Sequence, residues 1–260
     1  MLFYTKGRRI TYECGLLLKN LYEKQRTIYK KGEIDLVTDA DHLCESLFIK
    51  RIKLCFPSHS ILSEESGLRL NDGDNLWIID PIDGTTNYSR RLSLFCISVG
   101  FAYKRKLQFG FVFAPVLNQF FEAGIGLGAF LNRKRIHVSV QDKLNDCFLT
   151  TGFPYSIRTE NCLDNLKLFS HFSKKTLAVR RLGSAALDLC YVASGIFDGY
   201  WEISLHPWDF AGGKVILEEA GGLLTNFKGL PLSLKDSDIL ATNSIIHSTM
   251  IENIGSIHET

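Results

Sequence analysis

Short apolar segments separated by tight turns fill residues 95–140, and this pattern constrains the fold more than any other. Two of the turns lie at Lys104-Arg105-Lys106 and Val116-Leu117-Asn118. Segments of this length joined by such turns predict an antiparallel meander. The predicted strands are Phe95–Tyr103, Leu107–Phe113, Gln119–Ala123 and Ile136–Val140. Polar residues and a proline interrupt the apolar stretch at 107–131, so it is not a membrane span.

Helical patterns flank the meander on both sides, and they alternate with further short apolar segments. The predicted helices are Ile10–Glu23, a helix from Asp39 to just before Pro57, Asn161–Phe172, Ser184–Ala193 and Asp209–Ala220. The predicted strands outside the meander are Ser60–Leu62, Leu76–Ile79, Cys147–Thr151 and Tyr200–Ile203. Helices that alternate with sheets predict layered α/β or α+β packing. We expect one unit over residues 1–260, with an N-terminal half to about 142 and a C-terminal half from about 143.

Composition excludes several classes of function. The chain has 260 residues, of which 45% are apolar, and this is enough for a large core. The net charge of +2 and the short, scattered basic clusters argue against a nucleic-acid partner. The seven cysteines form no C-x-x-C pair, and several stand in apolar segments, which is typical of reduced thiols in a cytoplasmic protein. The N-terminus lacks an apolar core of signal-peptide length, so we expect a soluble, cytoplasmic protein without membrane contact.

The strongest chemical signal is the run Asp80-Pro81-Ile82-Asp83-Gly84-Thr85-Thr86, which directly follows a predicted buried strand. A turn containing proline can aim both carboxylates and the Ile82 carbonyl at one point, because Pro81 has a fixed φ and donates no hydrogen bond. Gly84 lets the backbone approach a ligand closely. A helix that begins at Thr85-Thr86 would offer free N–H groups to a phosphate. An ordinary Asp-Pro and Asp-Gly turn is the alternative interpretation.

Two further carboxylates stand at the ends of other predicted elements. Glu64 follows the strand Ser60–Leu62, and Asp209 begins a helix beside the bulky Trp208. Alone, the first could be a solvated loop residue and the second a helix N-cap. Together with Asp80 and Asp83 they are hard oxygen ligands, and magnesium is the cation that such a set favours. Magnesium ions can neutralise a phosphate monoester and activate a bound water.

Other phosphate and nucleotide motifs do not fit. Gly124-Ile125-Gly126-Leu127-Gly128 hints at a dinucleotide fingerprint, but a strand-like segment follows it rather than a helix. We therefore predict a turn of the meander there. The sequence contains no Cys-x5-Arg phosphatase loop, and no Cys or His cluster has the spacing of a zinc site.

Taken together, residues 80–86 and 207–213 resemble the two signatures of the inositol monophosphatase family, which consists of magnesium-dependent, lithium-sensitive phosphatases. Segments 30–41, 63–67, 183–189 and 219–222 fit the same family in the expected order. The resemblance implies a layered αβαβα sandwich, usually a homodimer, with two or three Mg²⁺ ions per site. It also implies hydrolysis of a phosphate monoester by water that the metal activates.

The resemblance also implies roles for individual residues. The implied metal ligands are Glu64, Asp80, the Ile82 carbonyl, Asp83 and Asp209, with Asp80 bridging two ions. The implied catalytic groups are Glu64, Asp80, Thr85, which would orient the attacking water, and Asp41, which would support Thr85. The implied substrate contacts are Ile82, Asp83, Gly84, Thr85, Arg180, Gly183, Ser184, Ala185, Glu202 and Asp209. Of these, the amides of Gly84 and Thr85 would hold the phosphate, and Glu202 with residues 183–185 would face the substrate hydroxyls. Lys30 matches a family lysine near the metal loop.

Three functions remain open at this stage. Hydrolysis of inositol monophosphate or a similar polyol phosphate is favoured, because residues 83–88 resemble the inositol monophosphatase version of the loop most. A fructose bisphosphatase, or a phosphatase for another small metabolite, belongs to the same enzyme class. A regulatory protein that binds the transcription machinery is the rival from another class.

Overall fold

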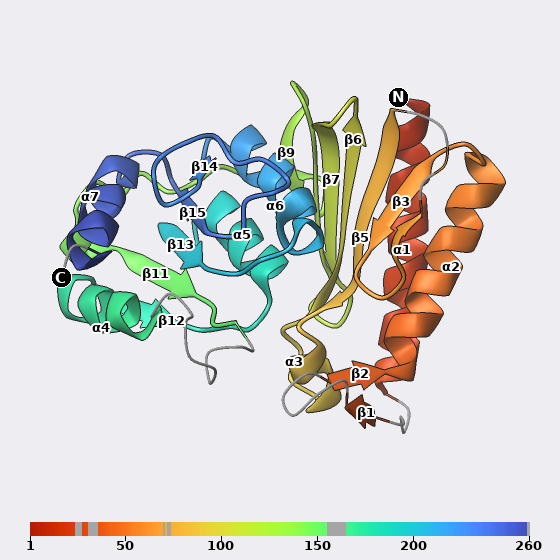
Figure 1. Cartoon of the computed structure of the whole chain (residues 1–260), viewed down its shortest axis with the longest axis horizontal. Coiled ribbons are helices and arrows are strands. Elements are labelled where there is room, and N and C mark those ends of the chain that lie inside the picture. The colour runs from red at the N-terminus through yellow and green to blue at the C-terminus, as the bar shows by residue number, and fades with distance from the viewer. Residues whose placement is uncertain (24–27, 31–35, 70, 72–73, 155–164, 259–260) are drawn as a thin grey trace.

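Helices and sheets alternate in five layers (Figure 1). This computed structural model describes residues 1–23, 28–30, 36–69, 71, 74–154 and 165–258. The first layer holds α1 (Leu2–Tyr22) and α2 (Asp39–Cys55), and the larger sheet follows. The middle layer holds α5 (Ala185–Ala193) and α6 (Pro207–Glu219), and the smaller sheet follows. The last layer holds α4 (Asn165–Lys175) and α7 (His247–His258). The expected αβαβα sandwich is confirmed.

The larger sheet has the strand order β10-β9-β8-β7-β6-β5-β3-β4. Its strands are β3 (Ser60–Ser63), β4 (Gly67–Arg69), β5 (Asn75–Asp83), β6 (Cys96–Tyr103), β7 (Lys106–Ala114), β8 (Gln119–Gly124), β9 (Gly128–Leu131) and β10 (Lys134–Arg135). Neighbours from β5 to β10 pair antiparallel, so the predicted meander is confirmed. Only the β3–β5 pair is parallel among the described strands of this sheet.

The predicted strand Ile136–Val140 is wrong, and β9 with β10 takes its place in the meander. Gly126 and Gly128 have φ angles of 75° and 84°, which close a tight turn between β8 and β9. Glu219 of α6 accepts hydrogen bonds from both of these glycine N–H groups. The Val138 N–H donates to the Ala220 carbonyl, so this segment crosses from the sheet to the end of α6. The glycine-rich run is thus a turn of the meander, as expected.

The smaller sheet has the order β12-β11-β13-β15-β14. Its strands are β11 (Phe148–Thr151), β12 (Ala178–Arg180), β13 (Gly199–Glu202), β14 (Leu223–Thr225) and β15 (Ile239–Thr242). The remaining elements are the hairpin β1 (Ile28–Lys30) and β2 (Leu36–Thr38), the short helix α3 (Thr85–Ser89) and the 3-10 turn Leu144–Asp146. The predicted helix at 161–172 corresponds to α4, and its first four residues lie outside the described part of the chain.

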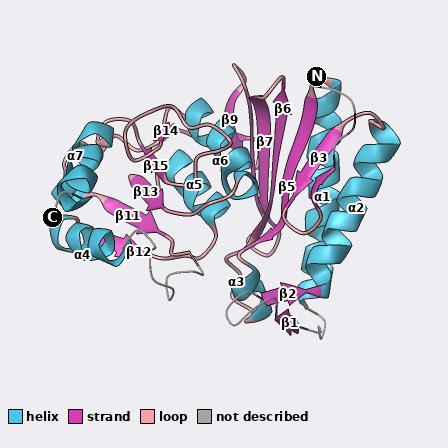
Figure 2. Ribbon diagram, viewed as in Figure 1, coloured by secondary structure: helices cyan, strands magenta, loops and turns pink. Residues whose placement is uncertain are grey.

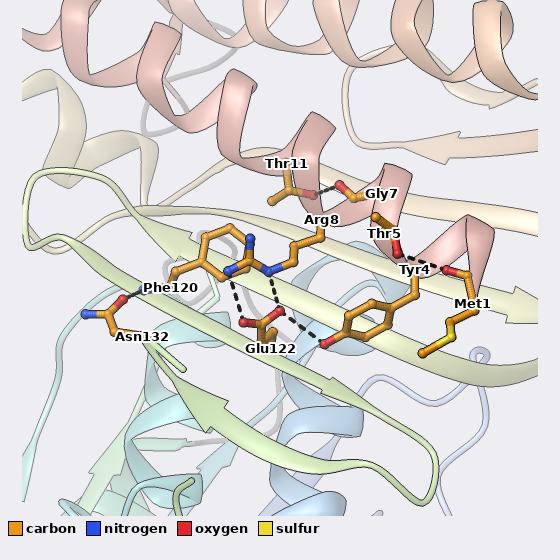
Figure 3. A network of polar contacts seen from close by, with 9 residues as sticks. All are labelled: Met1, Tyr4, Thr5, Gly7, Arg8, Thr11, Phe120, Glu122 and Asn132. Atoms are coloured by element: carbon orange, nitrogen blue, oxygen red, sulfur yellow. Dashed lines mark hydrogen bonds and ion pairs between the residues drawn. The ribbon is translucent and has the colours of Figure 1, made fainter. Parts of the chain in front are cut away.

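The first helix begins at Leu2, eight residues before its predicted start. The early turns carry aromatic and charged side chains rather than an aliphatic stripe, and the tertiary structure supplies their partners. Tyr4 packs edge-on against Phe111 and donates to a Glu122 carboxylate oxygen 3.1 Å away (Figure 3). Arg8 donates to both oxygens of Glu122, at 2.6 and 3.1 Å. This ion pair fastens the N-terminal turns of α1 to strand β8.

Apolar side chains fill three spaces between the layers. One core lies between α1, α2 and the larger sheet, and it centres on Phe48, Trp77 and Phe113. A second lies between the larger sheet and the helices α5 and α6. A third packs α4 and α7 against the smaller sheet. Because helices cover both faces of the larger sheet (Figure 2), its central strands are apolar almost throughout.

Candidate active site

The first part of the predicted turn, Asp80–Asp83, is instead the irregular end of strand β5, and helix α3 begins at Thr85 as expected. Pairing with β6 continues to Asp83, but the register shifts between Asp80 and Asp83. Pro81 cannot donate a hydrogen bond to a neighbouring strand, which favours such a bulge. The Asp80 side chain is 2% exposed, and its Oδ1 atom has no hydrogen-bond partner among the residues that the structure describes. A buried carboxylate oxygen without a donor is suited to a bound cation.

The electrostatics of Asp80 point the same way. Burial raises its pKa well above the ordinary value, and the charges of Glu64, Asp83, Asp209 and Asp41 raise it further. Burial likewise raises the pKa of Asp209, and the charges of Asp83, Glu64 and Glu202 raise it further. Acids that raise one another's pKa values share one region, and a divalent cation would offset their repulsion. The donor set therefore fits magnesium.

The described carboxylate groups are not close enough together in this structure to coordinate one ion jointly. Within the described ranges, no three His, Cys, Asp or Glu side chains stand close enough together to hold an ion. Two of the predicted ligands accept backbone hydrogen bonds instead. Asp83 faces the start of α5, and Asp209 Oδ2 accepts the His206 N–H at 2.6 Å in a capping box at the start of α6. Asp209 therefore has the ordinary capping role of an Asp at this position, and its role as a metal ligand stays a prediction.

Asp83 caps a helix from the other half of the chain. Its oxygens accept the N–H groups of Ala185 at 3.2 Å and Ala186 at 2.7 Å, and the Ser184 hydroxyl at 2.6 Å. Burial raises the pKa of Asp83 to about 6, although these hydrogen bonds oppose part of the rise. Ser184 occupies the predicted N-cap position, but its side chain makes no capping bond to α5. The structure thus brings the predicted residues Ser184 and Ala185 against Asp83.

Helix α3 and its residue Asn87 connect the end of β5 to the loop that precedes α5. Gly84 precedes α3 with a φ of 93°, and a Cβ there would lie 3.0 Å from the Leu94 carbonyl. The Asn87 side chain donates to the carbonyls of Leu94 at 2.7 Å and Leu182 at 2.8 Å. It therefore holds the loop before α5 next to the β5–α3 connection. The sequence pattern gives Asn87 no individual role, because its partner Leu182 stands 95 residues away.

The other predicted catalytic groups, Thr85, Asp41 and Glu64, lie near the end of β5. The Thr85 hydroxyl donates to the Ile82 carbonyl at 3.0 Å, so these two predicted groups are neighbours. Asp41 is buried at the start of α2, and its charge acts on Asp80. The Glu64 N–H donates to the Ile79 carbonyl at 3.3 Å, which ties the predicted metal loop to β5. The support of Thr85 by Asp41 stays a prediction.

Glu202 at the end of β13 forms a second, adjacent acidic position. It accepts a short hydrogen bond from the Tyr200 hydroxyl. Burial raises its pKa to about 7, and Asp83 adds to the rise while Tyr200 and the charge of Arg181 oppose it. Gly152 packs so closely on this carboxylate that a Cβ there would overlap it. No motif in the sequence links Gly152, Tyr200 or Arg181 to Glu202, so only the structure identifies them as its neighbours.

The resemblance also names two basic residues, Arg180 and Lys30, and the structure describes side-chain contacts for Arg180. The Arg180 guanidinium lies 5.1 Å over the Phe148 ring and donates to the Val179 carbonyl. Its contact with substrate stays a prediction. Lys30 belongs to strand β1, and its side chain lies outside the described part of the structure.

Comparisons with known proteins identify the family of the chain. Residues 4–259 match the inositol monophosphatase family. The chain is 41% identical to an inositol-1-monophosphatase of Synechocystis over 94% of its own length and 85% of the relative's. It is 36% identical to the Nus factor SuhB of Escherichia coli K12, with 95% and 93% covered. The solved structure of an inositol monophosphatase from Anabaena superimposes with a TM-score of 0.90 at 39% identity, with 98% and 96% covered. No described helix is long and apolar enough to cross a membrane.

Proposed function

The chain belongs to the inositol monophosphatase family, and we propose that it hydrolyses the phosphate monoester of a small polyol, with inositol monophosphate as the preferred substrate. One observation carries the proposal. Asp80 is buried with an oxygen that lacks a donor among the described residues, and four other acids raise its pKa. Such a site needs a cation, and a cation there can bind a phosphate monoester.

The residues that would hold Mg²⁺ are Glu64, Asp80, the Ile82 carbonyl, Asp83 and Asp209. When bound, the ions neutralise phosphate charge and lower the pKa of a coordinated water. The Ile82 carbonyl already accepts the Thr85 hydroxyl, and its second lone pair remains for another partner. Because that bond uses the Thr85 proton, the Thr85 oxygen remains an acceptor that would orient a water, and Asp41 would support it. We propose two or three ions per site and inhibition by lithium.

Each end of the substrate would meet a different set of groups. The amides of Gly84 and Thr85 would hold the phosphate, while Glu202 would accept hydrogen bonds from the polyol hydroxyls. Ser184 and Ala185 contact Asp83 directly, which supports their placement beside the phosphate position. A site built to hydrogen-bond hydroxyls discriminates against substrates that leave its polar groups unpaired. Arg180 remains the candidate contact for a second phosphate, which keeps fructose bisphosphate among the substrates to test.

The test measures phosphate release from three substrates, with and without Mg²⁺: inositol monophosphate, fructose bisphosphate and a phosphorylated adenosine nucleotide. We expect release only with Mg²⁺ and the highest kcat/KM for inositol monophosphate. A tenfold preference for the nucleotide, about 1.4 kcal/mol of transition-state stabilisation, would overturn the substrate assignment. Release unaffected by chelation would overturn the metal assignment.

A regulatory role is the second candidate, and the resemblance to the Nus factor SuhB over 95% of the chain favours it. Such a role would use protein contacts and would survive loss of the metal site. A pull-down of the transcription machinery with Asp80→Asn separates the two functions, because that variant should lose hydrolysis only. We also propose a homodimer, which light scattering after size exclusion will test.

A further inference from the structure

Helix α2 presents a buried polar face to the acidic site. Asp41, Cys44 and Glu45 lie within about one helical turn of one another and are all buried. Asp41 already has a proposed role, but Glu45 has none. The Glu45 side chain is 5% exposed, which is costly for a carboxylate unless its oxygens are occupied.

Glu45 contacts the loop between β3 and β4. Its Oε1 atom accepts the Ser66 N–H at 3.0 Å and the Ser66 hydroxyl at 2.8 Å. Hydrogen bonds to an ionised acceptor are stronger than neutral ones. Ser66 stands two residues after Glu64, the predicted metal ligand of this loop. Glu45 therefore anchors the backbone just beyond that ligand.

The neighbouring residue of α2 contacts the other source of ligands. The Cys44 thiol lies 3.6 Å from the Pro81 carbonyl, in hydrogen-bonding geometry, between Asp80 and Ile82 on the bulged end of β5. Two consecutive residues of α2 thus touch the two strand ends that carry predicted metal ligands. Helix α2 packs against β5 (Figure 1), and β5 pairs with β3, so α2 can set the distance between the two loops.

We propose that Glu45 is a positioning residue for the divalent-cation site, acting through Ser66 on the placement of Glu64. This inference rests on the proposed function, since it assigns Glu45 to the same metal site. Groups that orient a metal ligand from outside the coordination sphere commonly change metal affinity by about 10- to 100-fold when removed. Loss of Glu45 should therefore weaken cation binding before it weakens the chemical step.

The test compares the full-length wild type with Glu45→Leu, Glu45→Gln and Ser66→Ala. Calorimetry gives the Kd for Mn²⁺ without substrate, and phosphate release gives the Mg²⁺ concentration for half-maximal activity. We expect Glu45→Leu to raise both values by about tenfold or more, with kcat at saturating Mg²⁺ within about threefold. Glu45→Gln keeps the acceptor oxygen and should stay within about threefold of wild type. Ser66→Ala keeps only the backbone donor and should lie between them.

Glu122→Leu serves as the matched control, because it removes a buried glutamate whose partners are Tyr4 and Arg8. Its Mn²⁺ affinity should equal that of the wild type even if its melting temperature falls. Equal weakening by Glu122→Leu would overturn the inference, since general destabilisation would then explain the effect. Unchanged Mn²⁺ affinity in Glu45→Leu would overturn it as well. So would a Glu45→Gln variant as weak as Glu45→Leu, because charge rather than position would then matter.

The folding of Glu45→Leu and the activity of the wild type decide how the measurements are interpreted. If Glu45→Leu does not fold, the milder Ser66→Ala carries the test, and an unchanged Mn²⁺ affinity there contradicts the inference. If the wild type itself binds no Mn²⁺ and releases no phosphate, the proposed function falls and this inference falls with it. A wild type that binds and hydrolyses, beside variants that bind equally well, removes only the role of Glu45.

Discussion

Two buried carboxylates of the larger sheet have opposite surroundings. Glu122 on β8 is 6% exposed, and it receives both a guanidinium and a phenol hydroxyl from α1 (Figure 3). Asp80 on β5 is 2% exposed and lies among other acids, with one oxygen lacking a donor in the described structure. Burying a carboxylate is unfavourable unless a cation or donors neutralise it. The protein itself supplies the cation for Glu122, whereas the surroundings of Asp80 are suited to an external one.

The largest expected effect is on the Asp80 side of this comparison. Asp80→Asn should lower phosphate release by about a thousandfold or more, because a bound cation contributes several kcal/mol to catalysis. The same change should raise the melting temperature without metal, since it removes one charge from a repelling cluster. Phosphate release and thermal unfolding in a chelator measure the two effects. Asp74→Asn, at the exposed residue just before β5, should change neither. A lower metal-free melting temperature in Asp80→Asn would contradict this interpretation.

The Glu122 side should respond in the reverse way. Arg8→Met leaves the Glu122 carboxylate buried with Tyr4 as its one side-chain donor among the described residues. We expect a loss of about 2 kcal/mol in the free energy of unfolding, which is below the range for fully buried pairs because Arg8 is partly exposed. The kcat for inositol monophosphate should be unchanged. Urea unfolding measures the loss, and the double variant with Glu122→Leu should recover part of it. A large fall in kcat would show that the two carboxylates are coupled.

A smaller effect is expected where substrate hydroxyls would bind. Gly152→Ala would place a methyl group against the Glu202 carboxylate, which must then move. We expect kcat/KM for inositol monophosphate to fall about tenfold, equal to about 1.4 kcal/mol. Mn²⁺ affinity should stay the same, because the contacts described for Gly152 are with Glu202, Thr151 and Asn165 rather than with a predicted metal ligand. Steady-state kinetics and calorimetry distinguish this result from general damage, in which both quantities would change.

The smallest expected effect concerns a buried base that needs no cation. His247 lies between the hydroxyls of Thr225 and Thr242, each 2.9 Å from a ring nitrogen, and burial lowers its pKa to about 4. The unfolded state, with a pKa near 6.5, binds the proton more readily. Stability should therefore be complete above about pH 6.5 and fall as the pH drops towards 4. Urea unfolding of His247→Gln should show a flatter pH dependence, and an equally steep one would refute this.

Much of the fold could be predicted from the sequence, because it depends on local patterns. The helix from Asp39 stops before Pro57 as expected, and the strands of the meander up to Ala123 lie within one or two residues of the prediction. The misplaced strand at 136–140 has the same apolar character as a strand, but its partner is the end of α6. Periodicity indicates that a segment is extended, and it does not indicate which neighbour receives its hydrogen bonds.

The sequence by itself determined that acids stand near the ends of apolar elements. Glu64 follows β3 and Asp209 lies in the first turn of α6, whereas Asp80 lies within β5, which continues to Asp83. Only the tertiary structure decided what surrounds each one. Asp83 caps α5 across 102 residues of chain, and Gly152 packs on Glu202 because β11 and β13 are neighbours. Residue types and spacing define which chemical groups are available, whereas burial and long-range contacts set their pKa values. These contacts give Glu122 an arginine partner and leave one Asp80 oxygen without a donor among the described residues.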